Sequence, residues 1–199
     1  MNYKKSKNLD KNYWENRYDN HKTGWDIGYI STPIKEYIDQ LDTKNLHILI
    51  PGAGNNYEAE YLHNKGFKNV DVIDIATQPL NNFKKRVPSF PKTHLIQKNF
   101  FSHQKTYNLI IEQTFFSSLH PTDREKYVHK MHNLLSHNGK LIGLLFDVQF
   151  SKEGPPYGGS LNEYLQLFSS FFTIRVLDKC YNSIKPRFGR ELFFIFEKK

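Results

Sequence analysis

The stretch Leu46-His47-Ile48-Leu49-Ile50-Pro51-Gly52-Ala53-Gly54-Asn55-Asn56-Tyr57 decides how this chain folds. An apolar run typical of a buried strand ends in a Pro-Gly-Ala-Gly turn, and a polar segment of helical character follows. Gly52 and Gly54 have no side chain, so a ligand can approach the backbone closely there. The helix behind the turn presents unpaired N–H groups to the same place. The stretch therefore predicts a nucleotide-type binding crevice at the end of the first strand.

Strand-like and helix-like segments alternate after this turn. We expect strands at residues 46–50, 70–74, 93–97, 107–112 and 140–146, and helices from residue 55, from about residue 77, from residue 122 and at 161–168. Thr77 is the expected cap of the second of these helices, and Thr122 with Glu125 is the expected capping box of the third. Residues 172–177 and 192–197 follow each other as strands, which predicts a closing antiparallel hairpin at one edge.

This order predicts an α/β fold of the Rossmann-like class. The sheet should have seven mostly parallel strands, an antiparallel C-terminal strand and helices on both faces. The length of 199 residues favours a single domain over residues 1–199, with an N-terminal lid and helix at 1–45 and an α/β core at 46–199.

Composition narrows the class of protein. A hydrophobic fraction of 38% with 15% aromatic residues is too apolar for a disordered chain. The net charge of +8 suits small anionic substrates or nucleic acid, and the lack of a recognition motif disfavours nucleic acid. Cys180 is the single cysteine, so an intrachain disulfide is excluded. Without a signal peptide or a long apolar run, we expect a cytoplasmic protein, not membrane-bound, that acts as a monomer on a small molecule.

The glycine turn distinguishes between possible cofactors. The third glycine of a dinucleotide fingerprint is replaced here by the bulky Tyr57, which disfavours a pyrophosphate ligand. No G-x-x-x-x-G-K-[ST] loop for a nucleoside triphosphate is present. Asp74 ends the second strand 20 residues after Gly54, where such folds place a carboxylate for the ribose hydroxyls. Capping a helix or surface exposure are the alternative roles of Asp74. A ligand with a ribose and an adenine but no phosphate, such as S-adenosylmethionine, fits this turn.

Both tryptophans of the chain, Trp14 and Trp25, come before the first strand, with Tyr18 between them. Ordinary core packing would explain them. The alternative is an N-terminal flap over the crevice, where large rigid rings exclude water.

Six collinear blocks of sequence resemble the thiopurine S-methyltransferase superfamily, and within it the halide and thiol methyltransferases. They are Trp14-Glu15 with Thr23-Gly24-Trp25-Asp26-Ile27-Gly28, Ile50-Pro51-Gly52-Ala53-Gly54, Asn99-Phe100-Phe101, Thr114-Phe115-Phe116, Gly154-Pro155-Pro156-Tyr157 and Pro186-Arg187-Phe188-Gly189-Arg190-Glu191. The resemblance implies a class I methyltransferase that takes its methyl group from S-adenosylmethionine and releases S-adenosylhomocysteine.

The resemblance also implies cofactor contacts at nine positions: Trp14, Tyr18, Trp25, Gly52, Asp74, Ile75, Asn99, Phe100 and Gln113. Three residues depart from the family pattern. Tyr18 replaces a tryptophan of the plant members, Asn99 replaces an aspartate beside the adenine, and Gln113 replaces a tyrosine or arginine close to the transferred methyl group.

The acceptor we expect is a soft nucleophile such as a thiol, hydrosulfide, a halide or another chalcogen compound. An ionised nucleophile of this kind needs no general base, so alignment and desolvation can suffice. The segment after the fourth strand reads Glu112-Gln113-Thr114-Phe115, without the prolines common in amine methyltransferases of this fold. We assign no residue as certainly catalytic and expect no metal. The substrate-pocket candidates are Gln113, Phe116, Tyr157 and Arg187, of which Arg187 would attract an anion or lower a thiol's pKa unless it is a surface arginine.

Two other functions remain open from the sequence. The chain could methylate nitrogen or oxygen of a larger small molecule, or bind the cofactor without turnover.

Overall fold

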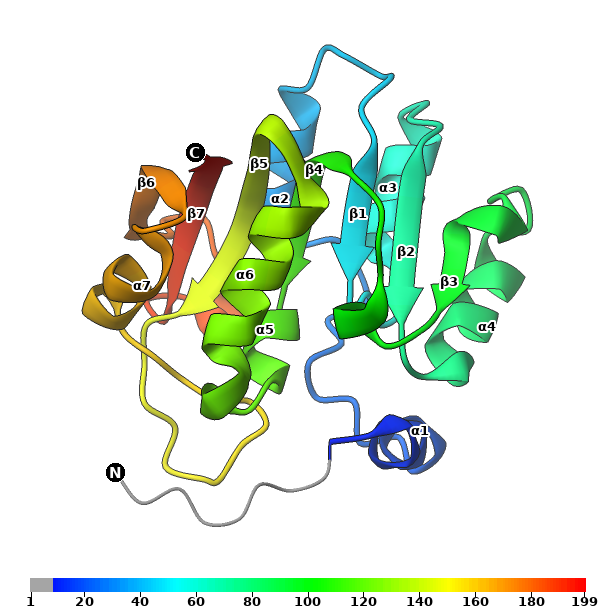
Figure 1. Ribbon diagram of the computed structural model, residues 1–199. Helices are drawn as coiled ribbons and strands as arrows, with labels where there is room; N and C mark the ends of the chain where they lie inside the picture. Colours follow the sequence, from blue (N-terminus) through cyan, green and yellow to red (C-terminus); the bar gives the residue numbers. More distant parts are fainter. Residues whose placement is uncertain (1–8) are drawn as a thin grey trace.

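The computed structural model describes residues 9–199. Within this range the chain forms one seven-stranded sheet in the order β3-β2-β1-β4-β5-β7-β6 (Figure 1). The strands are β1 Ile48–Pro51, β2 Val70–Asp74, β3 Leu95–Gln97, β4 Tyr107–Gln113, β5 Leu135–Phe146, β6 Phe172–Lys179 and β7 Glu191–Lys198. β1 to β5 pair in parallel, and β7 runs antiparallel to both β5 and β6. The predicted α/β fold is therefore confirmed.

The C-terminal hairpin of β6 and β7 forms one edge of the sheet, and its second strand, β7, is the inner one. β7 lies between β5 and β6, so that β6 is the edge strand. Burial explains this order. Leu192, Phe194 and Phe196 of β7 are at most 1% exposed, whereas β6 carries exposed charges at Arg175 and Lys179. The more apolar strand, β7, lies inside the sheet. The more polar strand, β6, forms the edge, where its charges disfavour pairing with a strand of another molecule.

Helices cover both faces of the sheet (Figure 1). They are α1 Lys11–Asp19, α2 Thr32–Asp39, α3 Tyr57–Asn64, α4 Thr77–Arg86, α5 Phe115–Ser118, α6 Arg124–Leu134 and α7 Leu161–Phe168. Alternate residues of each strand serve the two layers. Ile48 and Ile50 of β1 pack with α2, α3 and α4, and Leu49 packs with the layer of α5, α6 and α7. None of these helices is both long and apolar enough to cross a membrane.

The glycine turn needs backbone conformations that side chains disfavour. Gly52 has φ +57° and Gly54 has φ +53°, both in the left-handed region. Asn56 is also left-handed, at φ +62°, and its amide Nδ2 donates to the carbonyl of Gly54 at 2.6 Å. This extended turn delays the start of α3 to Tyr57, two residues later than the sequence predicts.

Two predicted helix caps are wrong. Ala76, not Thr77, is the cap residue of α4, because the carboxylate of Glu15 on α1 binds the first N–H groups of that helix instead. α6 follows a 3-10 turn at Pro121–Asp123 and begins at Arg124. Thr122 therefore contacts the ring of His120 through its hydroxyl, and no capping box forms with Glu125.

Candidate active site

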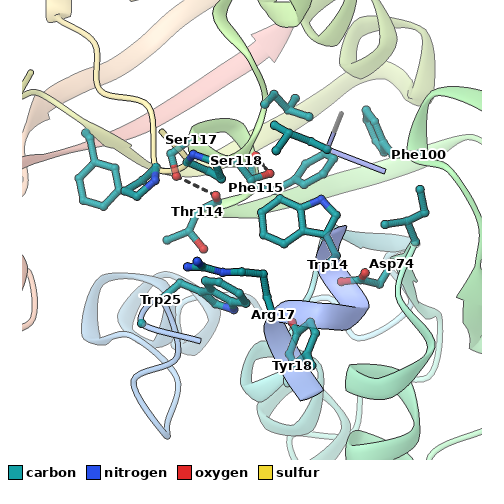
Figure 2. A pocket seen from close by; sticks show the side chains of 18 of the residues that line it. Trp14, Arg17, Tyr18, Trp25, Asp74, Phe100, Thr114, Phe115, Ser117 and Ser118 are labelled. Carbon is teal, nitrogen blue, oxygen red and sulfur yellow. Dashed lines mark hydrogen bonds between the residues drawn. The ribbon is translucent and has the colours of Figure 1, made fainter. Parts of the chain in front are cut away.

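A cavity of about 460 Å³ opens at the C-terminal ends of the central parallel strands. Gly52 follows β1, Asp74 ends β2 and Thr114 follows β4, and all three line the cavity. Helix α1 lies across the opening and contributes Trp14 and Tyr18 (Figure 2). Ligands of open parallel sheets bind at this end of the strands, next to the point where the strand order reverses.

Asp74 is the acidic residue of the cavity wall. Its carboxylate accepts hydrogen bonds from the backbone N–H of Ala76 at 2.8 Å and of Gly54 at 3.3 Å, which joins the end of β2 to the glycine turn. Burial raises the pKa of Asp74 to about 6, although these N–H groups favour the ionised form. At neutral pH the site therefore contains a carboxylate that can accept further hydrogen bonds from a ligand.

The N-terminal aromatic residues form a lid of edge-to-face rings. The ring of Trp25 lies 5.6 Å from that of Trp14 and 5.7 Å from that of Tyr18, at interplanar angles of 79° and 81°. Burial raises the pKa of Tyr18, whose hydroxyl stays neutral. Of the two interpretations of these residues, the flap agrees with the structure, because all three side chains line the cavity.

Arg187 is a buried residue of the cavity wall. It is 9% exposed and lines the cavity, which excludes the interpretation of Arg187 as a surface residue. Its Nη2 donates to the carbonyl oxygen of Trp25 at 2.8 Å, and its Nη1 lies 3.5 Å from the carboxylate of Glu191. Burial raises the pKa of Glu191, and the guanidinium opposes that shift. The C-terminal loop thus places a cation inside the cavity and fastens the lid with the same side chain.

Most of the predicted site residues meet in this cavity. Its wall includes Trp14, Tyr18, Trp25, Gly52, Asp74, Ile75, Asn99, Phe100 and Arg187. Asn99 also caps a short 3-10 turn, since its side-chain oxygen accepts the N–H of Phe101 at 2.9 Å. A second lone pair of that oxygen remains for a ligand.

Three candidates lie outside the large cavity, contrary to expectation. Gln113 shares a strand face with Leu109 and Ile111, so it points toward α2, where its Oε1 accepts from the hydroxyl of Ser31 at 3.0 Å. It borders a separate cavity of about 40 Å³ beneath the glycine turn. Phe116 is a core residue, 1% exposed, because the turn at Thr114 directs Phe115 into the cavity instead.

The third displaced candidate is Tyr157. Its ring lies 5.4 Å from the ring of His120, and its backbone N–H donates to the carbonyl of Ser117 at 2.7 Å. The preceding Pro155 and Pro156 line the cavity in its place.

Sequence reasoning missed several residues of the wall. Arg17, Lys98, Phe115 and Arg190 line the cavity. Arg17 could have been found from helical spacing, because it follows Trp14 by three positions and therefore shares its side of α1. Phe115 could not be separated from Phe116 without the conformation of Thr114, which has φ +65°.

The residues fit S-adenosylmethionine. The carboxylate of Asp74 suits a pair of ribose hydroxyls, and the left-handed glycines leave the turn open to a ligand. A Cβ atom on Gly52 would lie 2.1 Å from the ring of Phe115, so no larger residue fits there without displacing the cavity wall. Trp14 and Tyr18 supply an aromatic cover.

Comparisons with known proteins agree with this geometry. The family model of thiopurine S-methyltransferase matches residues 9–198. Probable thiol methyltransferase 2 of Arabidopsis thaliana is 26% identical over 185 residues, 89% of this chain and 81% of that protein. Thiocyanate methyltransferase 1 of Brassica oleracea is 24% identical over 185 residues, which also cover 89% of this chain and 81% of that protein.

Solved structures share the fold at low identity. The 1,6-didemethyltoxoflavin-N1-methyltransferase of Burkholderia thailandensis, bound to S-adenosylhomocysteine, superposes with a TM-score of 0.78 at 14% identity and covers 100% of this chain and 93% of its own. A TehB-like methyltransferase of Corynebacterium glutamicum has a TM-score of 0.64 at 18% identity, with 94% and 97% covered. The chain therefore belongs to the thiopurine S-methyltransferase family of S-adenosylmethionine-dependent methyltransferases.

Proposed function

We propose that this enzyme methylates a small, ionised, soft nucleophile, such as a thiolate, hydrosulfide, a halide or another chalcogen anion. The transfer would be a direct in-line displacement without a side-chain base. The names of the two plant relatives, a probable thiol methyltransferase and a thiocyanate methyltransferase, support acceptors of this class.

The charge of the cavity wall is the observation that carries this proposal. Among the described lining residues there is no histidine, cysteine or glutamate, and the one carboxylate, that of Asp74, belongs to the ribose end. A neutral amine or alcohol would need a proton acceptor beside it as it reacts. An anion needs none, and besides Arg17 on the lid helix the wall contains three cationic residues that can attract it: Lys98, Arg187 and Arg190.

The chain's own groups would act by binding, orientation and exclusion of water. S-adenosylmethionine, when bound, supplies a methyl group activated by its sulfonium centre. Arg187 is held by the carbonyl of Trp25 and by Glu191, so its guanidinium is fixed in position before an acceptor arrives. Phe146, Phe150 and Leu119 make the neighbouring wall apolar. An anion stripped of water between such surfaces reacts faster than in bulk solvent.

A panel of acceptors tests the proposal through the S-adenosylhomocysteine released. Hydrosulfide, small thiols, iodide, thiocyanate, a thiopurine and selenite would be compared with a primary amine and a phenol of similar size. We expect turnover with several soft anions and at least about a hundredfold less with the amine and the phenol. Asp74→Ala serves as the blank for cofactor-dependent product. Comparable turnover of the amine would overturn the proposal, as would tight S-adenosylhomocysteine binding without turnover of any soft anion.

A further inference from the structure

Arg17 is an arginine of the lid helix α1 with unused hydrogen-bonding capacity inside the cavity. Its guanidinium lies over the ring of Trp25, 5.6 Å from the ring centroid. Its Nε is buried and has no hydrogen-bond partner among the described residues. No carboxylate within residues 9–199 lies in ion-pair distance of it. Figure 2 shows the guanidinium beside Trp25, and Arg17 lines the cavity together with Thr114. A desolvated donor without a partner destabilises the ligand-free protein, so a ligand that accepts from it gains affinity.

The cofactor carries a group that needs such a partner. S-adenosylmethionine ends in an amino acid whose carboxylate is ionised at neutral pH. With the ribose at Asp74 and the adenine beside Asn99 and Phe100, this tail would lie at the glycine turn. Trp25, the ring beneath Arg17, borders that turn, since its Nε1 lies 3.7 Å from a Cβ built on Gly54. An anion enclosed beneath an apolar lid is costly unless a cation binds it. Asp74 cannot serve, since its own charge would repel the carboxylate.

The other cations of the wall are committed or placed elsewhere. Arg187 donates Nη2 to the carbonyl of Trp25. Its buried Nη1 makes no hydrogen bond, but it lies 3.5 Å from the carboxylate of Glu191, which balances the charge of the guanidinium. Lys98 is exposed and adjoins Asn99, at the adenine end. Arg190 is exposed in the C-terminal loop. Among the described lining residues, Arg17 is therefore the cation that makes no ion pair, has a buried nitrogen without a partner, and lies over a ring beside the glycine turn.

We infer that Arg17 binds the carboxylate of the cofactor's amino-acid tail and so couples the lid helix to the charged end of the ligand. This inference rests on the proposed function only through its cofactor and is independent of the acceptor. A planar guanidinium can hold a carboxylate through two parallel N–H bonds, which fixes the direction of the tail. Its stacking on Trp25 makes the lid close over the same contact.

Removing the guanidinium of Arg17 from the protein, or the amino-acid tail from the ligand, tests the inference. Calorimetry would measure S-adenosylhomocysteine and 5′-methylthioadenosine, which has the same nucleoside and thioether but no amino acid, against the wild type, Arg17→Met and Arg17→Lys. We expect Arg17→Met to lose about thirtyfold in affinity for S-adenosylhomocysteine and less than twofold for 5′-methylthioadenosine. Arg17→Lys keeps the charge without the fork, so its loss should be smaller.

Arg175→Met is the matched control, because Arg175 is an exposed arginine that pairs with Glu197 on the far edge strand. Its affinities should equal those of the wild type. Equal losses for both ligands in Arg17→Met would overturn the inference and make Arg17 a packing residue of the lid. Unchanged S-adenosylhomocysteine affinity with a raised acceptor KM would overturn it in favour of an acceptor contact. Failure of the wild type to bind S-adenosylhomocysteine would instead refute the proposed function itself.

Discussion

Glu15 of the lid helix caps a helix of the core. Its Oε1 accepts a hydrogen bond from the backbone N–H of Thr77 at 2.6 Å, and its Oε2 accepts one from Gln78 at 3.3 Å. Partial burial pulls the pKa of Glu15 upward, but these N–H groups outweigh it and the pKa is lowered overall. α4 begins three residues after Asp74, so this contact fixes the lid to the segment that bears the carboxylate of Asp74.

Removing the Glu15 carboxylate should release the lid. In Glu15→Ala the first N–H groups of α4 lose their partner, at a cost of about 1 kcal/mol. Trp14 and Tyr18 lie on the same helix. A loss of about 1 kcal/mol corresponds to a Kd about fivefold higher, so we expect calorimetry to show about fivefold weaker binding of S-adenosylhomocysteine. Saturating cofactor should restore kcat to within about twofold, because the lid then closes by mass action.

Two variants make the Glu15 result specific. Glu15→Gln retains an acceptor oxygen and should recover most of the affinity. Glu60→Ala removes from α3 the partly exposed partner of Arg86, which lies at the other end of α4, and should leave the affinity unchanged. A loss of kcat at saturating cofactor in Glu15→Ala would contradict a role confined to the lid.

Protonation of Asp74 should weaken cofactor binding in mild acid. Burial raises its pKa to about 6, so below that pH the carboxyl loses an acceptor site for the ribose hydroxyls. We expect S-adenosylhomocysteine affinity to fall up to tenfold per pH unit below about pH 6, and the affinity of Asp74→Asn to be lower but flat across the same range.

The ligand-free protein should show the opposite dependence. A carboxyl whose pKa rises on folding binds its proton more tightly in the folded state. The free energy of unfolding therefore falls as the pH rises from about 4 to about 6, and this slope should be missing in Asp74→Asn. Urea titrations of the wild type and the variant between pH 4 and pH 7 measure it. A slope of the same size in both proteins would contradict the raised pKa.

The regular parts of this fold could be predicted because each depends on local pattern. The strand at residues 70–74 and the helix at 161–168 agree with the structure at both ends, since apolar periodicity and a serine cap at Ser160 define them. Asp74 and Gly52 lie in the cavity as expected because the end of a parallel strand has a fixed place in the sheet.

The contacts made across the chain could not be predicted in this way. The cap of α4 is supplied by Glu15, 62 residues earlier in the chain, and local sequence favoured Thr77 instead. Gln113 was predicted from family resemblance, although strand alternation turns its side chain away from the cavity. Applying that alternation to β4 would have placed Gln113 on the α2 face of the sheet, beside the small cavity at the glycine turn.

Arg187 should contribute to both acceptor binding and stability. In Arg187→Met the buried carboxylate of Glu191 keeps Ser183 as a partner but loses its cation. We expect the free energy of unfolding to fall by about 3 kcal/mol near neutral pH. The KM for an anionic acceptor should rise while S-adenosylhomocysteine affinity changes less.

The stability loss in Arg187→Met should depend on pH. Burial already raises the pKa of Glu191, and without the guanidinium it should rise further. The folded variant then favours the protonated acid, so its deficit relative to the wild type should grow as the pH rises through the carboxyl range. Denaturant unfolding at pH 5 and pH 8 measures this, with Arg187→Lys as the variant that keeps the charge. A deficit equal at both pH values would refute the pairing.

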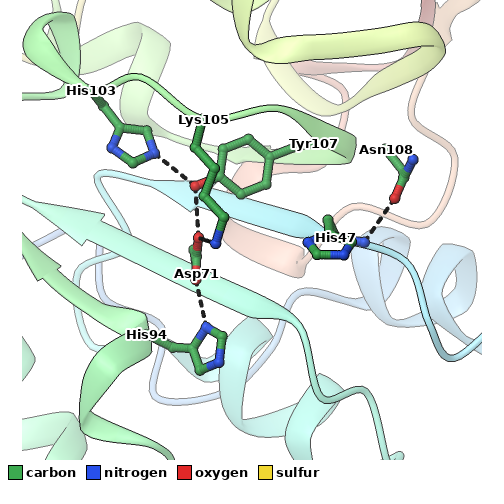
Figure 3. Close-up of polar contacts among 7 residues, drawn as sticks. All are labelled: His47, Asp71, His94, His103, Lys105, Tyr107 and Asn108. Atoms are coloured by element: carbon green, nitrogen blue, oxygen red, sulfur yellow. Dashed lines mark hydrogen bonds and ion pairs between the residues drawn. The ribbon is translucent and has the colours of Figure 1, made fainter.

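Asp71 anchors a polar network on β2 that is separate from the cavity (Figure 3). It is 2% exposed and accepts hydrogen bonds from the hydroxyl of Tyr107 at 2.8 Å and from Lys105 at 2.6 Å, while His94 lies at 2.5 Å. His103 joins the hydroxyl of Tyr107 at 2.7 Å. Burial alone would raise the pKa of Asp71, but its three partners outweigh that effect and lower it.

Asp71→Asn should therefore destabilise the fold without affecting the chemistry. We expect the free energy of unfolding to fall by about 3 kcal/mol at pH 7. The variant places a neutral, buried amide where the carboxylate now accepts from three donors. A carboxyl with a lowered pKa stabilises the fold above its unfolded pKa, near 4, and loses this contribution as the pH falls through the folded value. The difference in free energy of unfolding between wild type and variant should accordingly shrink below about pH 4.

Lys105→Met, which removes a partly exposed partner, should cost less than about 1 kcal/mol. If kcat and KM of folded Asp71→Asn at low temperature departed from the wild-type values by more than about twofold, the network would belong to the active site after all.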